Sequence, residues 1–557
     1  MAQVRELAER AHSDWLAAHP FQASGYGIPG YDDQAPDDSE AGDAARRSQL
    51  EASLTAAGRL DTSELSLEDS VTLGCVVEDA AAELAALDSK ALEHTVSAMP
   101  YSGPAVLMAT AARTILIDPG AAADYLARLR GGAGWIDRLA ERLQLGARSG
   151  RTPVAPLVDK TITWAEELLG PPSPLPLSIP DPPAGWDRAA SWRDERDAVA
   201  AEIVKPAIAR WVEVLRELRP LSRPAERPGL CFLPGGEGDY ARAIRAHTTL
   251  PLSAEQIHQT GLDHIATLES RVVELGEKLG LGHLEEIHEA LRASAGRLPP
   301  EESIGAAVGA IRRAEAGAAK FFTAPLPAPC AVTPMPTVVG VSGAAPHYTP
   351  PRLDGARPGT FWFNVDLPTA GTGYDLESVA FHEAVPGHHL QIARLQLLVD
   401  LPASQRQRYT SVFSEGWALY AEQLAEEMGL YNSTEALLGA MTASLMRAAR
   451  LVIDTGLHAF GWSGSRALDF YRAHVPLPVE FLSAEIDRYI TWPGQALAYL
   501  TGKLEILRLR EEAEARLGDR FALPQFHAAV LDSGSLPMPV LGRNIGAWID
   551  RAGSAPR

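Results

Sequence analysis

Helical periodicity is the feature that most restricts the fold of this 557-residue chain, because apolar residues recur at three- and four-residue spacing along most of its length. Segments 70–87 and 123–143 show the pattern clearly, and from residue 375 it continues almost to residue 537. One segment, TFWFNV at 360–365, is aromatic-rich, is flanked by glycine and proline, and predicts a strand instead. The sequence therefore predicts a mainly α fold with a small β-sheet.

Two segments rich in proline and glycine interrupt the helical pattern, PPSPLPLSIPDPP at 171–183 and RPLSRPAERPGLCFLPGGEG at 219–238. Proline removes a backbone donor and clashes with the preceding turn, so neither segment is expected to be regular helix. A long helix is predicted between them, and a new run of helices begins at the capping-box sequence SAEQ, residues 253–256. We place a boundary inside the second segment, which divides the chain into a helical region over 1–225 and another over 226–557.

Composition excludes several classes of protein. Hydrophobic residues make up 46% and charged residues 22%, and no run of about 18 apolar residues occurs, so we expect a globular protein without a membrane span. The formal net charge of −21 repels phosphate backbones, which argues against a nucleic-acid partner. The N-terminus looks like an amphipathic helix without the apolar core of a signal peptide, and the three cysteines lie far apart, so we expect a cytoplasmic protein. The oligomeric state is left open.

The segment HEAVPGHH, which begins at His382, resembles a zinc-binding HExxH motif that has been interrupted. In HExxH both histidines reach one ion from the same helix face, and the glutamate, here Glu383, holds the attacking water. Pro386 stands where the second histidine would be. On an unbroken helix His389 would lie about 10 Å further along the axis than His382, too far for a shared ion. Proline and the following glycine predict a break that brings His388 to the first histidine; His388 is favoured, with His389 as the alternative.

A third ligand is expected from the segment SEGWALYAE, in which Glu415 follows the histidines on another helix. Such a glutamate completes the two-histidine, one-glutamate set of catalytic zinc and leaves one position open for water. Gly416 is expected to let this helix approach the histidine helix. Glu422, two turns later, either orients a histidine or is an exposed acid. The sequence therefore predicts one Zn²⁺ ion held by His382, His388 and Glu415.

Longer motifs connect the chain to a known family. HEAVPGHHLQ, SEGWALYAEQL, RAARLVIDTGLHAFGW, YITWPGQALAYLTGKLEIL and LDSGSLPMPVL resemble the blocks of the bacterial domain-of-unknown-function family 885, over roughly residues 230–545. That family is regarded as related to the glutamate-ligand (gluzincin) clan of zinc peptidases. The resemblance implies a large two-lobed metallopeptidase-like fold with a deep cleft, one wall of which the N-terminal region would form. It also implies that His382, His388 and Glu415 hold zinc and that Glu383 is the catalytic glutamate.

Three polar residues at four-residue spacing, Arg450, Asp454 and His458, share one face of a predicted helix with apolar neighbours. Two interpretations remain open. The three form a buried structural stack, or His458 faces the cleft and stabilises the oxyanion, with Asp454 fixing its tautomer.

Further candidates follow along the chain. Tyr499 is the first candidate for a tyrosine that donates to the oxyanion, and Tyr489 is the second. Arg488 and Lys503 are candidates for binding a substrate carboxylate, although exposed charge is the ordinary alternative. The predicted strand is either a cleft edge on which Asn364 holds the backbone of a substrate or part of a structural hairpin.

Together these features predict a zinc-dependent peptidase that hydrolyses short peptides, with Glu383 as general base and His458 or Tyr499 at the oxyanion. One alternative is a zinc hydrolase of a non-peptide amide or ester with the same ligands. A second is a non-catalytic binding protein on a peptidase-like scaffold.

Overall fold

The computed structural model of the protein describes residues 2–170, 176–294, 299–335, 345–365 and 374–554. The described part is mainly helical, with one three-stranded sheet, as the sequence predicts. The helices of the N-terminal region are α1 (Ala2–Ala18), α2 (Pro20–Gly25), α3 (Glu40–Gly58), α4 (Leu67–Ser89), α5 (Ala105–Arg113), α6 (Pro119–Arg148), α7 (Ala155–Leu169), α8 (Ala189–Val199) and α9 (Lys205–Leu218). A single π-helical segment, Ala200–Val204, joins α8 to α9, so the predicted long helix is present.

The remaining helices carry the candidate site. They are α10 (Gly236–Thr248), α11 (Ala254–Glu277), α12 (Leu284–Ser294), α13 (Pro300–Gly317), α15 (Leu376–Glu383), α16 (His388–Leu397), α17 (Ala403–Gln407), α18 (Ser411–Glu427), α19 (Thr434–His458), α20 (Gly464–His474), α21 (Val479–Thr491), α22 (Ala498–Leu517), α23 (Leu523–Leu531) and α24 (Met538–Ser554). The predicted capping box opens α11, where the Ser253 and Gln256 side chains each bond the other residue's backbone N–H.

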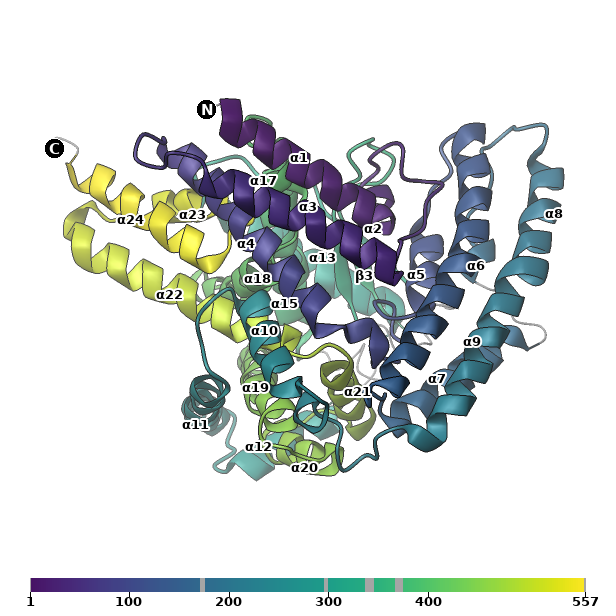
Figure 1. The fold of residues 1–557 in the computed structure, drawn as a ribbon. Helices are drawn as coiled ribbons and strands as arrows, with labels where there is room; N and C mark the ends of the chain where they lie inside the picture. The colour runs from purple at the N-terminus through teal and green to yellow at the C-terminus, as the bar shows by residue number, and fades with distance from the viewer. Residues whose placement is uncertain (1, 171–175, 295–298, 336–344, 366–373, 555–557) are drawn as a thin grey trace.

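The N-terminal region divides its contacts between two parts of the molecule. Helices α5–α9 enclose a hydrophobic core of their own, to which Leu129, Trp192 and Trp211 belong. Helices α1, α3 and α4 pack together, and they also contact α10, α17 and α24 of the C-terminal region. Figure 1 shows α6–α9 grouped at one side of the molecule, whereas α1, α3 and α4 lie across the helices of the other half. Packing therefore crosses the boundary predicted at residue 225.

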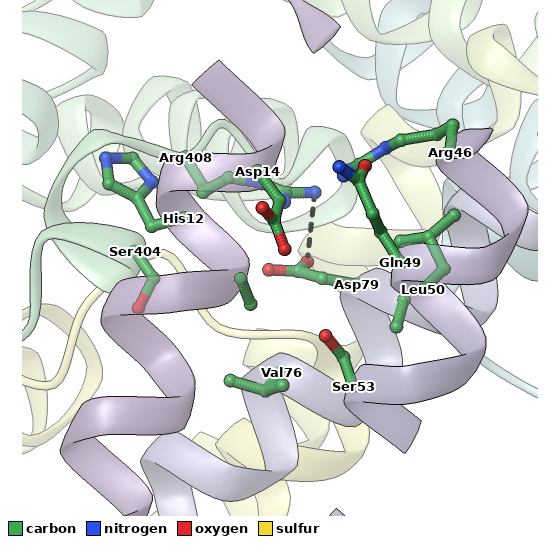
Figure 2. A pocket seen from close by; sticks show the side chains of 12 residues that line it. His12, Asp14, Arg46, Gln49, Leu50, Ser53, Val76, Asp79, Ser404 and Arg408 are labelled. Carbon is green, nitrogen blue, oxygen red and sulfur yellow. Dashed lines mark ion pairs between the residues drawn. The ribbon is translucent and has the colours of Figure 1, made fainter. Parts of the chain in front are cut away.

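The contact between α4 and the residue after α17 is ionic and lies beside a small cavity (Figure 2). The Arg408 guanidinium lies 3.6 Å from Asp79 and 3.3 Å from Glu83, and its carbon sits 4.9 Å above the Trp15 ring. Two acids and one aromatic ring of the N-terminal helices therefore fix the position of Arg408.

The sheet contains β1 (Ala331–Pro334), β2 (His347–Thr349) and β3 (Thr360–Phe363) in the order β1-β3-β2. Strand β3 is parallel to β1 and antiparallel to β2, so the predicted strand is the central one. Phe361 and Phe363 of β3 are buried in a cluster with residues of α13 and α15. The sheet is thereby attached to the helix that carries His382.

The core of the C-terminal region is centred on α19, whose residues pack against α11 and α20. Among the described helices, α19 alone has the length and apolar composition of a membrane span, and 83% of its most apolar window is buried inside the protein.

Candidate metal centre

The helix that carries the first histidine ends where the sequence predicts a break. Helix α15 begins directly after Asp375 and ends at Glu383, and α16 begins at His388. Gly387 sits at the restart with φ −80° and ψ −131°. A Cβ atom on Gly387 would lie 1.9 Å from the carbonyl oxygen of His382, so only glycine fits this turn.

Hydrogen bonds hold the break in place. The Trp417 Nε1–H of α18 donates to the carbonyl of Pro386 at 2.9 Å, and the Trp417 side chain is fully buried. The backbone N–H of Leu390 in α16 donates across the break to the carbonyl of Ala384 at 3.3 Å. These backbone groups are satisfied without a continuous helix, which makes the interruption a stable part of the fold.

Two histidines and one glutamate converge across the break. The imidazole rings of His382 and His388 have centroids 4.8 Å apart and stand almost perpendicular. The Nε2 atoms of His382 and His388 lie 3.6 Å and 3.5 Å from Oε2 of Glu415 on α18. All three side chains are buried, and one donor atom from each lies within 4.8 Å of the other two.

This geometry fits a divalent ion. Zinc binds histidine nitrogen and carboxylate oxygen at 2.0–2.2 Å, so neighbouring donors of a tetrahedral site stand about 3.4 Å apart. The two nitrogen–oxygen separations, 3.6 Å and 3.5 Å, are close to that spacing. No other group of three histidine, cysteine or acidic side chains meets the same criterion within the described ranges. His382, His388 and Glu415 could therefore hold one metal ion.

Glu422 holds the first histidine in orientation, as one of the two interpretations of this residue predicted. Its Oε1 accepts a hydrogen bond from His382 Nδ1–H at 2.7 Å, and its Oε2 accepts one from the Ser378 hydroxyl at 2.7 Å. Burial alone would raise the pKa of Glu422, but the Arg447 guanidinium at 3.2 Å and His382 lower it to about 2. An ionised Glu422 fixes the His382 tautomer so that Nε2 faces Glu415.

Tyr409 is a site residue that the sequence analysis missed. Its hydroxyl donates to Oε1 of Glu415, which leaves Oε2 facing the two imidazoles. The side chain is 45% exposed while its hydroxyl reaches the buried carboxylate, so the tyrosine spans from the surface to the centre. Tyr409 lies between α17 and α18, outside every motif, and no spacing rule would have identified it.

Glu383 is buried next to the two histidines. Its Oε2 has no hydrogen-bond partner among the described residues, and the backbone N–H of Tyr348 on β2 faces its carboxylate. Burial raises the pKa of Glu383 above its ordinary value, against the attraction of the His382 and His388 imidazoles. A buried carboxylate oxygen without a donor is costly, and such groups are typical of sites that receive a ligand.

His389 points away from the centre. Its Nε2–H donates to the carbonyl of Ala328 at 2.7 Å, and its Nδ1 accepts from the Tyr348 hydroxyl at 3.0 Å. Both ring nitrogens are therefore occupied in holding the sheet to α16. Of the two histidines left open by the sequence, the structure brings His388 to the ligand position.

The prediction that His458 faces the cleft is wrong. The ring is fully buried, Nδ1 accepts from the backbone N–H of Leu230 at 3.1 Å, and Nε2–H donates to the carbonyl of Tyr489 at 3.0 Å. Burial lowers the pKa of His458 to about 4, so the ring is neutral. Asp454 does not orient it, because that carboxylate accepts from the Tyr240 hydroxyl at 2.7 Å.

Two further expectations need correction. The Tyr489 hydroxyl donates to Glu485 at 2.7 Å and its side chain is fully buried, so it does not face an oxyanion at the metal centre. Asn364 directly follows the central strand and is fully buried, whereas a substrate can pair only with an edge strand.

Gly416 serves a different contact from the one predicted. A Cβ atom on Gly416 would lie 2.6 Å from the backbone of Gly502 on α22. The glycine therefore allows α18 to approach α22, rather than the histidine helix. This contact sets the position of α18 and, with it, Glu415.

Tyr499 and three cations lie around the centre. The Tyr499 ring stacks on the His382 ring, with centroids 6.4 Å apart and planes 17° apart. The central carbon of the Arg450 guanidinium lies 4.5 Å from the centroid of the Tyr499 ring. Arg488 shares the carboxylate of Glu485 with Arg450. Lys503 is half-buried, and burial lowers its pKa while Glu422 opposes the shift.

Comparisons with known proteins place these features in context. A family model described as a bacterial protein of unknown function, DUF885, matches residues 20–545. The crystal structure of a candidate lipoprotein from Colwellia psychrerythraea is similar over 99% of both chains, with 27% identity and a TM-score of 0.88. A candidate lipoprotein of unknown function from Shewanella oneidensis shares the fold over 97% of this chain and 98% of its own, with 15% identity and a TM-score of 0.71. No curated protein matches the chain.

Proposed function

The chain belongs to the bacterial DUF885 family, and from its buried centre we propose that it is a zinc-dependent peptidase that hydrolyses short peptides. The family description names no activity, so the proposal rests on geometry. The observation that carries it is the convergence of His382, His388 and Glu415 beside Glu383, a buried carboxylate with an unpartnered oxygen. A closed structural metal site would need a fourth protein ligand and no adjacent base.

The residues divide the chemistry among them. A bound zinc ion supplies a Lewis acid that polarises a carbonyl and makes water acidic near neutral pH. Glu383 takes a proton from the attacking water and returns it to the leaving amine. Tyr499, which stacks on His382, donates a hydrogen bond to the developing oxyanion.

The choice of short peptides follows from access. The side chains of His382, His388, Glu383 and Glu415 are all less than a tenth exposed, so a folded protein surface cannot reach them. An extended peptide can enter along β2, an edge strand whose Tyr348 N–H faces Glu383. The same residues would serve a non-peptide amide or ester, and the substrate assay separates the two.

The cellular location remains a separate matter. The lipoprotein description belongs to the two relatives of known structure. The expectation that this chain is cytoplasmic stays a prediction.

Elemental analysis of two neighbouring histidine variants tests the metal. We expect one zinc per chain in the wild type, loss of zinc in His388→Asn, and retention in His389→Asn, because His389 is bound to the sheet. Circular dichroism confirms that both variants are folded. A full zinc complement in His388→Asn would remove this histidine from the ligand set.

A library of quenched fluorescent peptides tests the reaction, with zinc-loaded protein in the presence and absence of a chelator. A panel of esters and non-peptide amides is assayed under the same conditions. We expect peptide cleavage that chelator abolishes and zinc restores. Cleavage of esters without cleavage of any peptide would favour the alternative hydrolase. Zinc binding without hydrolysis of any substrate would favour a binding protein.

A further inference from the structure

Behind Tyr499 lies a buried group with more positive than negative charge. Arg450 donates to Glu485 Oε2 at 2.7 Å, and Arg488 donates to Oε1 of the same carboxylate at 3.1 Å. The Tyr489 hydroxyl also donates to Oε2, so Glu485 is fully occupied. Arg450 is 6% exposed and Glu485 is 9% exposed. Two guanidinium ions therefore share one carboxylate away from bulk solvent.

Among the described residues, Glu485 is the only acid that forms a salt bridge with Arg450 or Arg488. Asp454 is bound to Tyr240 and to the backbone of Gly494, and burial raises its pKa to about 7. Asp487 forms an ion pair with Lys160. An uncompensated buried cation is unfavourable, so the group is complete only when an anion binds.

Arg450 is the cation with a free donor. All three donor nitrogens of Arg488 have partners, because Nε and Nη2 donate to Glu485 and Nη1 donates to the Gln495 carbonyl oxygen. Arg450 donates through Nε and Nη2, whereas its buried Nη1 has no partner among the described residues. The anionic groups of an ordinary peptide are carboxylates, and a guanidinium binds a carboxylate through charge-assisted hydrogen bonds.

The distance to the metal centre limits what that carboxylate can be. The Arg450 guanidinium lies 4.5 Å from the Tyr499 ring, which lies 6.4 Å from the His382 ring. Arg450 is therefore no more than about 11 Å from His382. An extended chain advances about 3.3–3.6 Å per residue, so no more than about three residues separate a carboxylate at Arg450 from a bond cleaved at the centre.

We propose that Arg450 binds the C-terminal carboxylate of the substrate, with Arg488 neutralising Glu485, so that the enzyme releases one to three residues from the C-terminus of short peptides. This inference rests on the proposed peptidase activity. It assigns the direction of cleavage and makes Arg450 the residue that determines specificity for a free C-terminus.

The first experiment compares short peptides with a free C-terminus against the same peptides as C-terminal amides. We expect the wild type to prefer the acid by about 10–100-fold in kcat/KM, as the loss of a charged hydrogen bond implies. Arg450→Gln should abolish the preference for the acid, measured as the ratio of kcat/KM for the acid to kcat/KM for the amide. Arg313→Gln on α13, which removes the arginine that pairs with Glu377 of α15, is the matched control and should keep the preference.

The second experiment needs no turnover. Thermal unfolding of metal-free protein is followed with millimolar Ala-Ala and with Ala-Ala amide. We expect Ala-Ala to raise Tm and the amide to have no effect, and we expect Arg450→Gln to abolish the difference. If Arg450→Gln does not fold, Arg450→Lys replaces it, and the comparison of acid and amide in the wild type stands without any variant.

The outcomes separate this inference from the activity on which it rests. Equal cleavage of acids and amides overturns the inference and leaves the peptidase intact. A preference that follows an aspartate or glutamate side chain, and not the terminus, also overturns it. If no peptide is cleaved, the proposed function fails, and the Tm difference alone decides whether Arg450 binds a carboxylate.

Discussion

Two segments of the chain offer polar side chains at helical spacing, and the structure uses them differently. In the HEAVPGHH segment the helix stops at Glu383 and restarts at His388, and side chains from both parts converge on Glu415. In α19 the helix is continuous, and Asp454 and His458 each bind a partner of their own. Spacing along the sequence places side chains on one face of a helix. The groups that those side chains contact in the folded protein decide their role.

The difference lies in unused hydrogen-bonding capacity. Both ring nitrogens of His458 are bonded to backbone groups, so the ring has nothing left to offer a ligand. At the metal centre, by contrast, Oε2 of Glu383 and Nδ1 of His388 are buried without partners among the described residues. By the same criterion Arg450, with a free Nη1, belongs with the functional group although it lies on α19. A fully paired buried group has no capacity left for a ligand, whereas an unpaired one keeps that capacity.

The largest effect is expected for Glu383→Gln. The amide keeps the shape of the side chain but cannot accept the proton, so turnover should fall by about 10²–10⁴ while zinc is retained. Glu377→Gln is the matched control, because Glu377 is a buried acid on the same helix that pairs with Arg313. Steady-state kinetics measures the turnover of both variants, and elemental analysis measures their zinc content. Wild-type turnover in Glu383→Gln with zinc bound would show that Glu383 is not the base.

A smaller effect is expected for Glu422→Gln. The amide cannot balance His382 and Arg447 as the carboxylate does, so zinc affinity should fall by about 10–100-fold. Competition with a chromogenic chelator measures the affinity. An unchanged zinc affinity would show that the hydrogen bond from His382 to Glu422 does not contribute to metal binding.

Gly387→Ala tests the break itself. The added methyl group would meet the carbonyl of His382, so the turn must shift, at a cost of about 1–3 kcal/mol in unfolding free energy and with weaker zinc binding. Gly305→Ala on α13, where a Cβ meets nothing within 4 Å, should instead gain up to about 1 kcal/mol. Urea unfolding compares the two. A stable, zinc-loaded Gly387→Ala variant would contradict the requirement for glycine at the restart.

The smallest effect on turnover is expected for Asp454→Asn, which should alter only the pH dependence of stability. Burial raises the pKa of Asp454 from 3.8 to about 7, so between these values the folded protein holds a proton that the unfolded chain releases. The free energy of unfolding therefore falls as pH rises through this window, by up to about 1.4 kcal/mol per pH unit. Asp454→Asn should remove that slope. Lost turnover at an unchanged slope would return Asp454 to the active site.

Much of this arrangement could be predicted from the sequence, because local rules govern it. The periodicity gave a mainly helical fold, and Pro386 and Gly387 indicated where the histidine helix ends. Tyr409 could not be found in this way, since it reaches Glu415 from a connection without any motif. The hydrogen-bond partners of His458 could not be predicted either, because Leu230 and Tyr489 are distant from it in sequence and contact it only in the folded protein.

One consequence concerns how the chain can be divided. Arg408 is bound by Asp79 and Glu83 of α4, and the next residue, Tyr409, holds Glu415. Helix α4 is thus connected to Glu415, a candidate metal ligand, through the peptide bond between Arg408 and Tyr409. A fragment that starts near residue 226 would contain every candidate ligand and still lack the anchor of the segment that aligns one of them. Expression trials should therefore keep α1–α4 together with the helices that carry the candidate ligands, as one unit of folding.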